Sequence, residues 1–110
     1  MLNIRVDEDV DGYVTCRPMG ELDIYAVYQF RQALADMPSG SRVLIDMSDV
    51  SFVDASGLGA LVGGVRRARD RGSDVSLTYA KPVFRNLLHT IGLDRIVRIA
   101  DDVEPATAVA

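Results

Sequence analysis

The strongest constraint on how this chain folds is the segment SFVDASGLGAL, residues 51–61. It begins as an apolar strand end, continues through an acidic and two small residues, and then enters a helix pattern. The first turn of a helix has backbone N–H groups without intrahelical partners, and the positive end of the helix dipole lies there too. Such a turn favours anions. The Ser56 hydroxyl is therefore predicted either to cap the helix or to receive a phosphate from another protein.

A β-hairpin is predicted at the start of the chain. Apolar and polar residues alternate over residues 2–7, which is the period of a half-buried strand. Asp11-Gly12 is a strong hairpin turn signal, and residues 13–17 carry the β-branched and aromatic side chains of a second strand. Pro18 has no N–H, so we expect this second strand to end there or to lie at a sheet edge.

The first helix is predicted over residues 24–37, with Asp23 as its N-cap and a stop at residues 38–40. Tyr25 and Tyr28 fall partly off its apolar face, and we interpret them as the edge of the core. That face has three- and four-residue spacing and consists of Val27, Phe30, Leu34 and Met37.

Strands and helices then alternate to the end of the chain. The apolar run at residues 42–47 predicts a central strand buried on both faces. Residues 101–110 are expected to form an amphipathic tail, frayed over residues 103–110. The other expected elements are a loop over 48–51, a helix over 56–71, a strand over 74–80, a helix over 82–90 and a strand over 95–99.

The helix over residues 56–71 has three notable features. Gly63-Gly64 weakens the helix by about 1 kcal/mol per glycine. Close packing of the helix backbone against the sheet would explain why both glycines are tolerated. Gly72 suits the C′ position. We interpret the basic residues of its last turns as a solvated helix end that complements the dipole; they are Arg66, Arg67, Arg69 and Arg71.

These elements predict the fold class. Strands separated by helices favour a mixed sheet with right-handed crossovers, and 110 residues suffice for one core. We therefore expect a single small α/β domain over residues 1–110, with a mixed β-sheet that is opened by an N-terminal hairpin and packed against α-helices.

Charge and composition exclude some classes of partner. The net charge is −4, which disfavours nucleic acid and acidic membranes and favours a basic patch on a partner. Cys16 is the only cysteine, so no intrachain disulfide can form and a reducing compartment is expected. The longest apolar stretch, residues 58–65, is too short to span a bilayer, and no signal peptide pattern occurs. We expect a cytoplasmic protein.

Familiar catalytic and cofactor motifs do not match the sequence. His89 is the only histidine, so a metal site built on histidines is excluded. A Ser56–His89 pair remains conceivable, although the G-x-S-x-G motif of hydrolases is absent. A response-regulator site could use Asp46, Asp54 and Lys81, but the hairpin start and the short chain do not fit that fold. We expect neither an enzyme nor a cofactor.

Three segments resemble those of the anti-sigma factor antagonists, the bacterial members of the STAS domain family. They are GELD at residues 20–23, DASGLG at residues 54–59 and LLHTIGL at residues 87–93. The resemblance covers nearly the whole chain in order, and the first two segments together are fairly specific. It implies a protein that binds an anti-sigma factor, typically a serine kinase of the histidine-kinase-like ATPase fold, and thereby releases a sigma factor for transcription.

The resemblance also implies a phosphorylation switch. The kinase would modify the helix start and end the interaction, and a serine phosphatase would reverse this. A phosphate adds about −1.5 to −2 charge, which beside Asp54 and Asp23 would repel a docked surface. The partner-binding residues that the resemblance implies are Gly20, Glu21, Asp23, Asp54, Ala55, Ser56, Gly57, Leu58 and Gly59.

The sequence departs from the family pattern at the expected phosphoacceptor. Ala55, which has no hydroxyl, directly follows Asp54, where phosphorylated members have their serine. Ser56 lies one residue later, which is about 100° of rotation and 1.5 Å of rise along a helix. Ser56 is therefore a structural residue, a shifted phosphoacceptor or part of a docking surface that is not phosphorylated. The alternative function is a STAS-domain scaffold or subunit of a stressosome-like or lipid-transport complex. A monomer or a weak dimer is expected.

Overall fold

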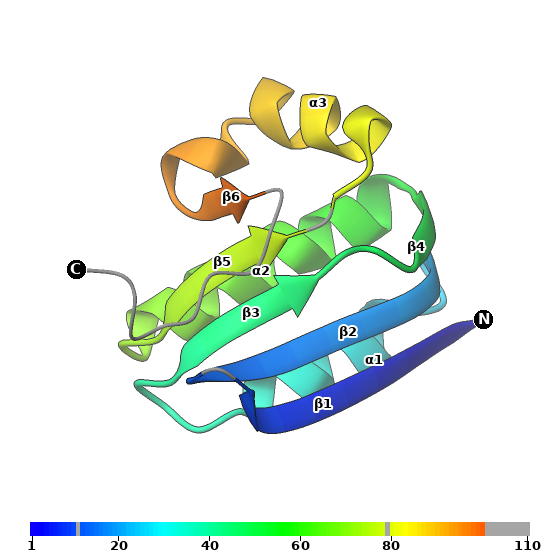
Figure 1. The fold of residues 1–110 in the computed structure, drawn as a ribbon. Coiled ribbons are helices and arrows are strands. Elements are labelled where there is room, and N and C mark those ends of the chain that lie inside the picture. The colour runs from blue at the N-terminus through cyan, green and yellow to red at the C-terminus, as the bar shows by residue number, and fades with distance from the viewer. Residues whose placement is uncertain (11, 79, 101–110) are drawn as a thin grey trace.

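The computed structural model describes residues 1–10, 12–78 and 80–100, and the predicted tail lies outside them. The chain forms a mixed sheet with helices (Figure 1), as the sequence predicted. The elements are β1 (Leu2–Val10), β2 (Tyr13–Leu22), α1 (Val27–Ala35), β3 (Arg42–Asp46), β4 (Val50–Val53), α2 (Ala55–Asp70), β5 (Asp74–Thr78), α3 (Pro82–Thr90), the 3-10 helix η1 (Leu93–Arg95) and β6 (Arg98–Ala100).

One sheet contains all six described strands. Its order is β1-β2-β3-β5-β6, and β4 pairs with β2 off this path. The predicted hairpin is confirmed, because β1 and β2 are antiparallel, whereas the remaining pairs are parallel. α1 and α2 lie together on one face of the sheet, and α3 lies beside its β6 edge (Figure 1).

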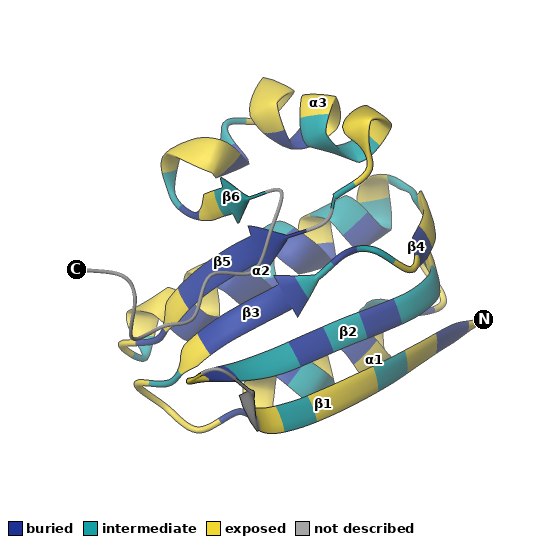
Figure 2. Cartoon of the chain, viewed as in Figure 1, coloured by how far each residue is buried: buried dark blue, intermediate teal, exposed yellow. Residues whose placement is uncertain are grey.

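The core fills the space between the sheet and the α1–α2 pair. Cys16, Ile45 and Leu77 are neighbours across β2, β3 and β5 and are fully buried. Figure 2 shows that β3 and β5 are buried over most of their length. Burial raises the pKa of the Cys16 thiol to about 12, because desolvation disfavours the thiolate. Leu44 is buried with Tyr13 in a separate cluster. β3 is thus buried on both faces, as predicted.

The prediction that Pro18 ends the second strand or lies at an edge was wrong. β2 continues to Leu22 and lies inside the sheet. β3 pairs with residues 14–16 of β2, and β4 pairs with residues 20–22. Residue 18 therefore has no partner on that side, where a missing N–H costs no ladder hydrogen bond.

The start of the first helix was also predicted wrongly. Asp23 caps a turn rather than the helix, because its carboxylate accepts a hydrogen bond from the Tyr25 amide at 3.0 Å, and α1 begins only at Val27. The predicted apolar face of α1 does pack on the core. Tyr25 and Tyr28, in contrast, are 93% and 79% exposed, so they do not form the edge of the core.

Two short elements near the strands were missed. The expected loop over residues 48–51 contains the start of β4, a strand of 4 residues that pairs only with the end of β2. η1 follows the turn at Gly92 and delays the last strand to Arg98. Both segments are shorter than the window over which apolar periodicity is recognisable. α3, by comparison, has the predicted bounds.

Gly64 of α2 faces α1, whereas the sequence predicted that the backbone at Gly63-Gly64 packs against the sheet. A Cβ added at Gly64 would lie 2.4 Å from Cδ1 of Leu34. Arg71 is not solvated as expected, since its guanidinium donates to the carbonyls of Ala35 at 3.0 Å and Leu34 at 3.1 Å. Gly72, at φ +83°, takes the predicted C′ position.

We predict opposite effects of alanine at the two adjacent glycines. Gly63→Ala should stabilise the protein by about 1 kcal/mol through helix propensity, since the added Cβ would meet only the flexible end of Arg67. Gly64→Ala should destabilise it by about 1–3 kcal/mol, because the helix contact is overpacked. Urea unfolding measures both. Equal effects of the two substitutions would contradict the packing described for Gly64.

Candidate partner-binding site

The candidate site lies where β2 and β4 leave the sheet. The two strands run parallel, and Leu22 pairs with Val53. Parallel strands end at the same edge of a sheet, so Asp23 and Asp54, each one residue further along, leave it side by side. The structure thus brings together the GELD and DASGLG segments, the two segments that carry most of the family resemblance.

The Asp54 carboxylate joins these two segments. Its Oδ1 accepts a hydrogen bond from the Gly57 amide at 2.8 Å and caps α2. Its Oδ2 accepts from the Ile24 amide at 3.2 Å, across 30 residues of sequence. The Asp54 amide in turn donates to the Leu22 carbonyl at 3.3 Å. Asp54 therefore fixes the start of α2 and the turn after β2 at once.

Gly57 and Gly59 have different environments. A Cβ at Gly57 would lie 1.8 Å from the Leu22 carbonyl oxygen, so this residue has to be glycine for α2 to approach β2. Gly57 is buried and supports the site from below. Gly59 is exposed, with no heavy atom within 4 Å of an added Cβ. Of these two glycines, only Gly59 is accessible to a partner.

Ala55, Ser56 and Leu58 form the start of α2. Ser56 does not cap the helix, because Asp54 holds that position. The Ser56 side chain is half-buried, and its hydroxyl makes no hydrogen bond within the described part of the chain. Ala55 is exposed, whereas Leu58 packs partly against the core. The hydroxyl of Ser56 is thus free of a structural role in capping.

Gly20 and Glu21 complete the predicted set on β2. Gly20 has φ +113°, a left-handed conformation that L side chains rarely adopt, and its amide donates to the Asp49 carbonyl at 2.9 Å. The neighbouring Glu21 is exposed and pairs with Phe52 of β4. Gly20 therefore shapes the strand end, and Glu21 lies on its surface.

Sequence reasoning missed an exposed apolar group around these residues. Large apolar side chains are seldom exposed together on a monomer unless the surface binds something. Ile24 and Phe52 are 62% and 50% exposed; Ile24 follows Asp23 in the chain, and Phe52 pairs with Glu21 between β2 and β4. Tyr25 follows Ile24 in the turn after β2, and Tyr28 lies in the first turn of α1, so exposed apolar side chains occur on both segments of the site. The only sequence signal was that the two tyrosines fall off the apolar face of α1.

Charges elsewhere do not suggest a catalytic or metal site. His89 pairs with Asp94, a hydrogen bond that lowers the pKa of the Asp94 carboxyl, and no hydrogen bond joins His89 to Ser56. No group of three or more His, Cys, Asp or Glu side chains could hold a metal ion within residues 1–10, 12–78 and 80–100.

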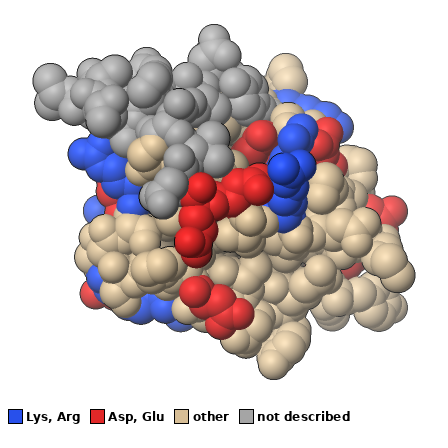
Figure 3. All heavy atoms as spheres, turned by 60° about the horizontal axis from the view of Figure 1, so that its bottom comes forward, with Lys and Arg blue, Asp and Glu red and all other residues tan. Residues whose placement is uncertain are grey.

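The face drawn in Figure 3 has acidic side chains near its centre, basic ones beside them and a broad uncharged area. No extended basic surface is visible on that face. Over the same described ranges, none of the helices has both the length and the hydropathy that a membrane crossing requires.

Comparison with known proteins agrees with this fold. A family model described as "Mlab, STAS domain" matches residues 16–98, so the chain belongs to the STAS domain family. It is 28% identical to the anti-sigma-B factor antagonist of Listeria monocytogenes over 100 residues, which cover 89% of this chain and 88% of the relative. It is also 28% identical to that of Bacillus subtilis over 101 residues, covering 90% and 93%.

A solved structure supports the same family. The crystal structure of an anti-sigma factor antagonist from Mycobacterium paratuberculosis has a TM-score of 0.73 and 26% sequence identity. The similarity covers 94% of this chain and 88% of that one. The resemblance first noted in the GELD and DASGLG segments is thus confirmed over most of the chain.

Proposed function

We propose that this chain is an anti-sigma factor antagonist that binds a kinase-type anti-sigma factor and so releases a sigma factor for transcription. The names of the relatives support this function. The observation that carries it in the structure is the double hydrogen bond of Asp54, which assembles the two family segments into one exposed surface. The protein acts by binding, as a single domain in the cytoplasm.

The docking surface is acidic at its centre and aromatic around it. Interfaces are enriched in aromatic side chains, which carry much of the binding free energy. The exposed carboxylate of Glu21 and the half-buried carboxylate of Asp23 favour a partner with basic residues. We define the docking surface by its exposed and half-buried members, which are Glu21, Asp23, Ile24, Tyr25, Tyr28, Phe52, Ala55, Ser56 and Gly59.

Phosphorylation of Ser56 would switch this surface off, and a serine phosphatase would restore it. The hydroxyl makes no hydrogen bond within the described residues, and it lies in the first turn of α2, where the dipole favours a phosphate. The added negative charge would lie beside Asp54, inside the docking surface, and would repel a partner that had docked on carboxylates.

A second candidate function is supported by the description of the family model, "Mlab, STAS domain". In this alternative the chain is a STAS-domain subunit of a lipid-transport or stressosome-like complex. The same docking surface would then hold a permanent partner instead of an anti-sigma factor. Purification of the chain from its own cells separates the two functions by the partner that co-purifies.

We predict that Tyr25→Ala weakens binding to the anti-sigma factor from the same organism by at least about tenfold, the loss of one interface anchor. Val83→Ala is the matched control, because Val83 is also exposed but lies on α3. It should change the affinity by less than about twofold. Calorimetry measures both. Binding to no anti-sigma factor, or equal losses in the two variants, would contradict the proposed function.

We also predict that incubation with a bound kinase-type anti-sigma factor and ATP adds the mass of one phosphate to the wild type. Ser56→Ala should gain none, because the preceding residue has no hydroxyl to replace it. Intact-mass spectrometry gives the result. No gain in the wild type, despite binding, would remove the switch and leave the antagonist function intact.

A further inference from the structure

A hollow lies between α1 and α2, outside the docking surface. Its volume is about 260 Å³, and it is lined by Arg31, Arg67, Asp70 and Arg71, with an apolar floor of Leu34, Ala35 and Gly64. None of these residues belongs to the docking surface, and all except Arg31, at the middle of α1, lie in or just after the C-terminal halves of the two helices. The hollow is therefore separate from the proposed partner-binding site.

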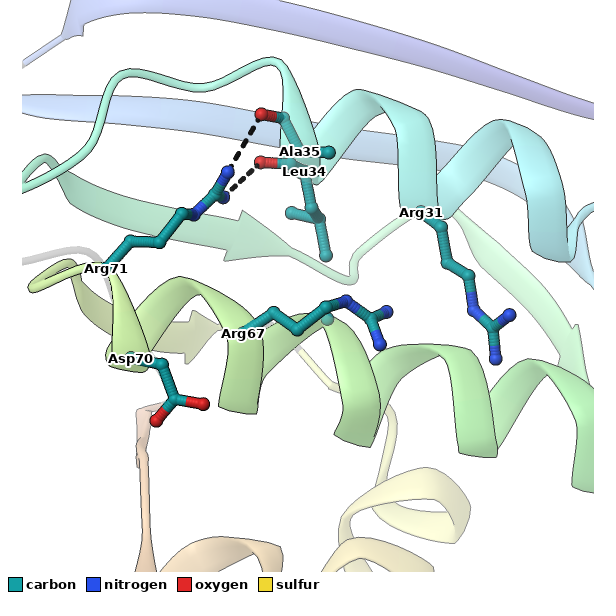
Figure 4. Close-up of a pocket in the computed structure, with 7 residues that line it drawn as sticks. Arg31, Leu34, Ala35, Arg67, Asp70 and Arg71 are labelled. Carbon is teal, nitrogen blue, oxygen red and sulfur yellow. Dashed lines mark hydrogen bonds between the residues drawn. The ribbon is translucent and has the colours of Figure 1, made fainter.

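Two of the three arginines direct unpaired charge into this hollow. The Arg31 side chain extends from α1 toward α2, the Arg67 side chain runs along α2 toward the Arg31 side, and that of Asp70 points away from both (Figure 4). Neither guanidinium makes an ion pair or a hydrogen bond within the described ranges of the chain. Arg71 differs, since its guanidinium is held by the α1 carbonyls. Two guanidinium groups from facing helices that make no ion pair within these ranges favour an anion between them.

The two glycines of α2 make this arrangement possible. A Cβ at Gly63 would lie 3.3 Å from Nη1 of Arg67, so the arginine lies along the helix over a position that has no side chain. Gly64 allows Leu34 of α1 to approach. The helix carries both glycines although each disfavours it by about 1 kcal/mol. The sequence thus accommodates the arginine and the helix contact together.

The chemistry of the hollow points to one class of ligand. A guanidinium is planar and binds phosphate or carboxylate oxygens bidentately, and two of them balance a dianion better than a monoanion. The floor is apolar, so it suits an organic group attached to that anion. We propose that the hollow binds the phosphate monoester of a small organic molecule, with Arg31 and Arg67 on the phosphate and Leu34 beneath the organic group.

The proposal is tested by NMR titration of the full chain with phenyl phosphate. Binding should saturate with Kd below about 1 mM and should shift the signals of Leu34, Ala35 and Gly64. Arg31→Ala and Arg67→Ala should each weaken it at least about tenfold. Arg66→Ala is the matched control, since it removes the same charge from the same helix outside the hollow, and it should change Kd by less than about twofold.

Two further compounds test separately the contributions of the phosphate dianion and of the attached organic group. Benzoate, a monoanion with the same ring, and inorganic phosphate, which lacks the ring, should both bind at least about fivefold more weakly. No saturation by phenyl phosphate at about 10 mM, or equal weakening by Arg66→Ala, would overturn the site. Benzoate or inorganic phosphate binding as tightly as phenyl phosphate would overturn the assigned ligand class. None of these results depends on the docking surface.

Discussion

The Asp54 carboxylate is the interaction on which the arrangement of this protein depends. A charged acceptor that receives two backbone N–H groups is stronger than a neutral one, and an N-cap of this kind contributes about 0.5–2 kcal/mol. One of its oxygens starts α2 and the other holds the turn after β2. Without it, the two segments of the docking surface would be joined only by the short pairing between the ends of β2 and β4 and by the contact of Gly57 with Leu22.

The α1–α2 pair connects two surfaces of opposite character. Its start carries acidic and aromatic residues, and its end carries the arginine hollow. The close contact of Gly64 with Leu34 sets the distance between the helices at that end, while Gly57 sets the approach of α2 to β2 at the other. Gly57 and Gly64 thus position the two surfaces, and the side chains proposed to bind ligands lie around these glycines.

Much of the fold followed from local sequence patterns. The hairpin, the central strand and the bounds of α3 depend on turn residues, apolar runs and a proline at a helix start, which act within a few residues. The course of β2 through Pro18 depends instead on which strand lies next to it, and β4 exists only because the end of β2 has an unpaired side. Neither can be deduced from a single segment.

The meeting of the GELD and DASGLG segments was predictable, but the exposure of the side chains around them was not. The family resemblance predicted which two segments meet, and their parallel strands bring them together. The exposure of Tyr25 and Tyr28 could not be derived, because the first helix starts three residues later than its capping pattern indicates. The role of Arg71 likewise depends on carbonyls of another helix that are distant in the sequence.

The most direct test of this account is the affinity of Asp54→Asn for the anti-sigma factor, with amide hydrogen exchange of the free protein measured beside it. Asparagine keeps one oxygen to cap α2, but its NH₂ group cannot accept from the Ile24 amide. In this variant the Gly57 amide should stay protected, the Ile24 amide should exchange faster, and the affinity should fall about tenfold. Unchanged affinity together with faster exchange at Ile24 would contradict it.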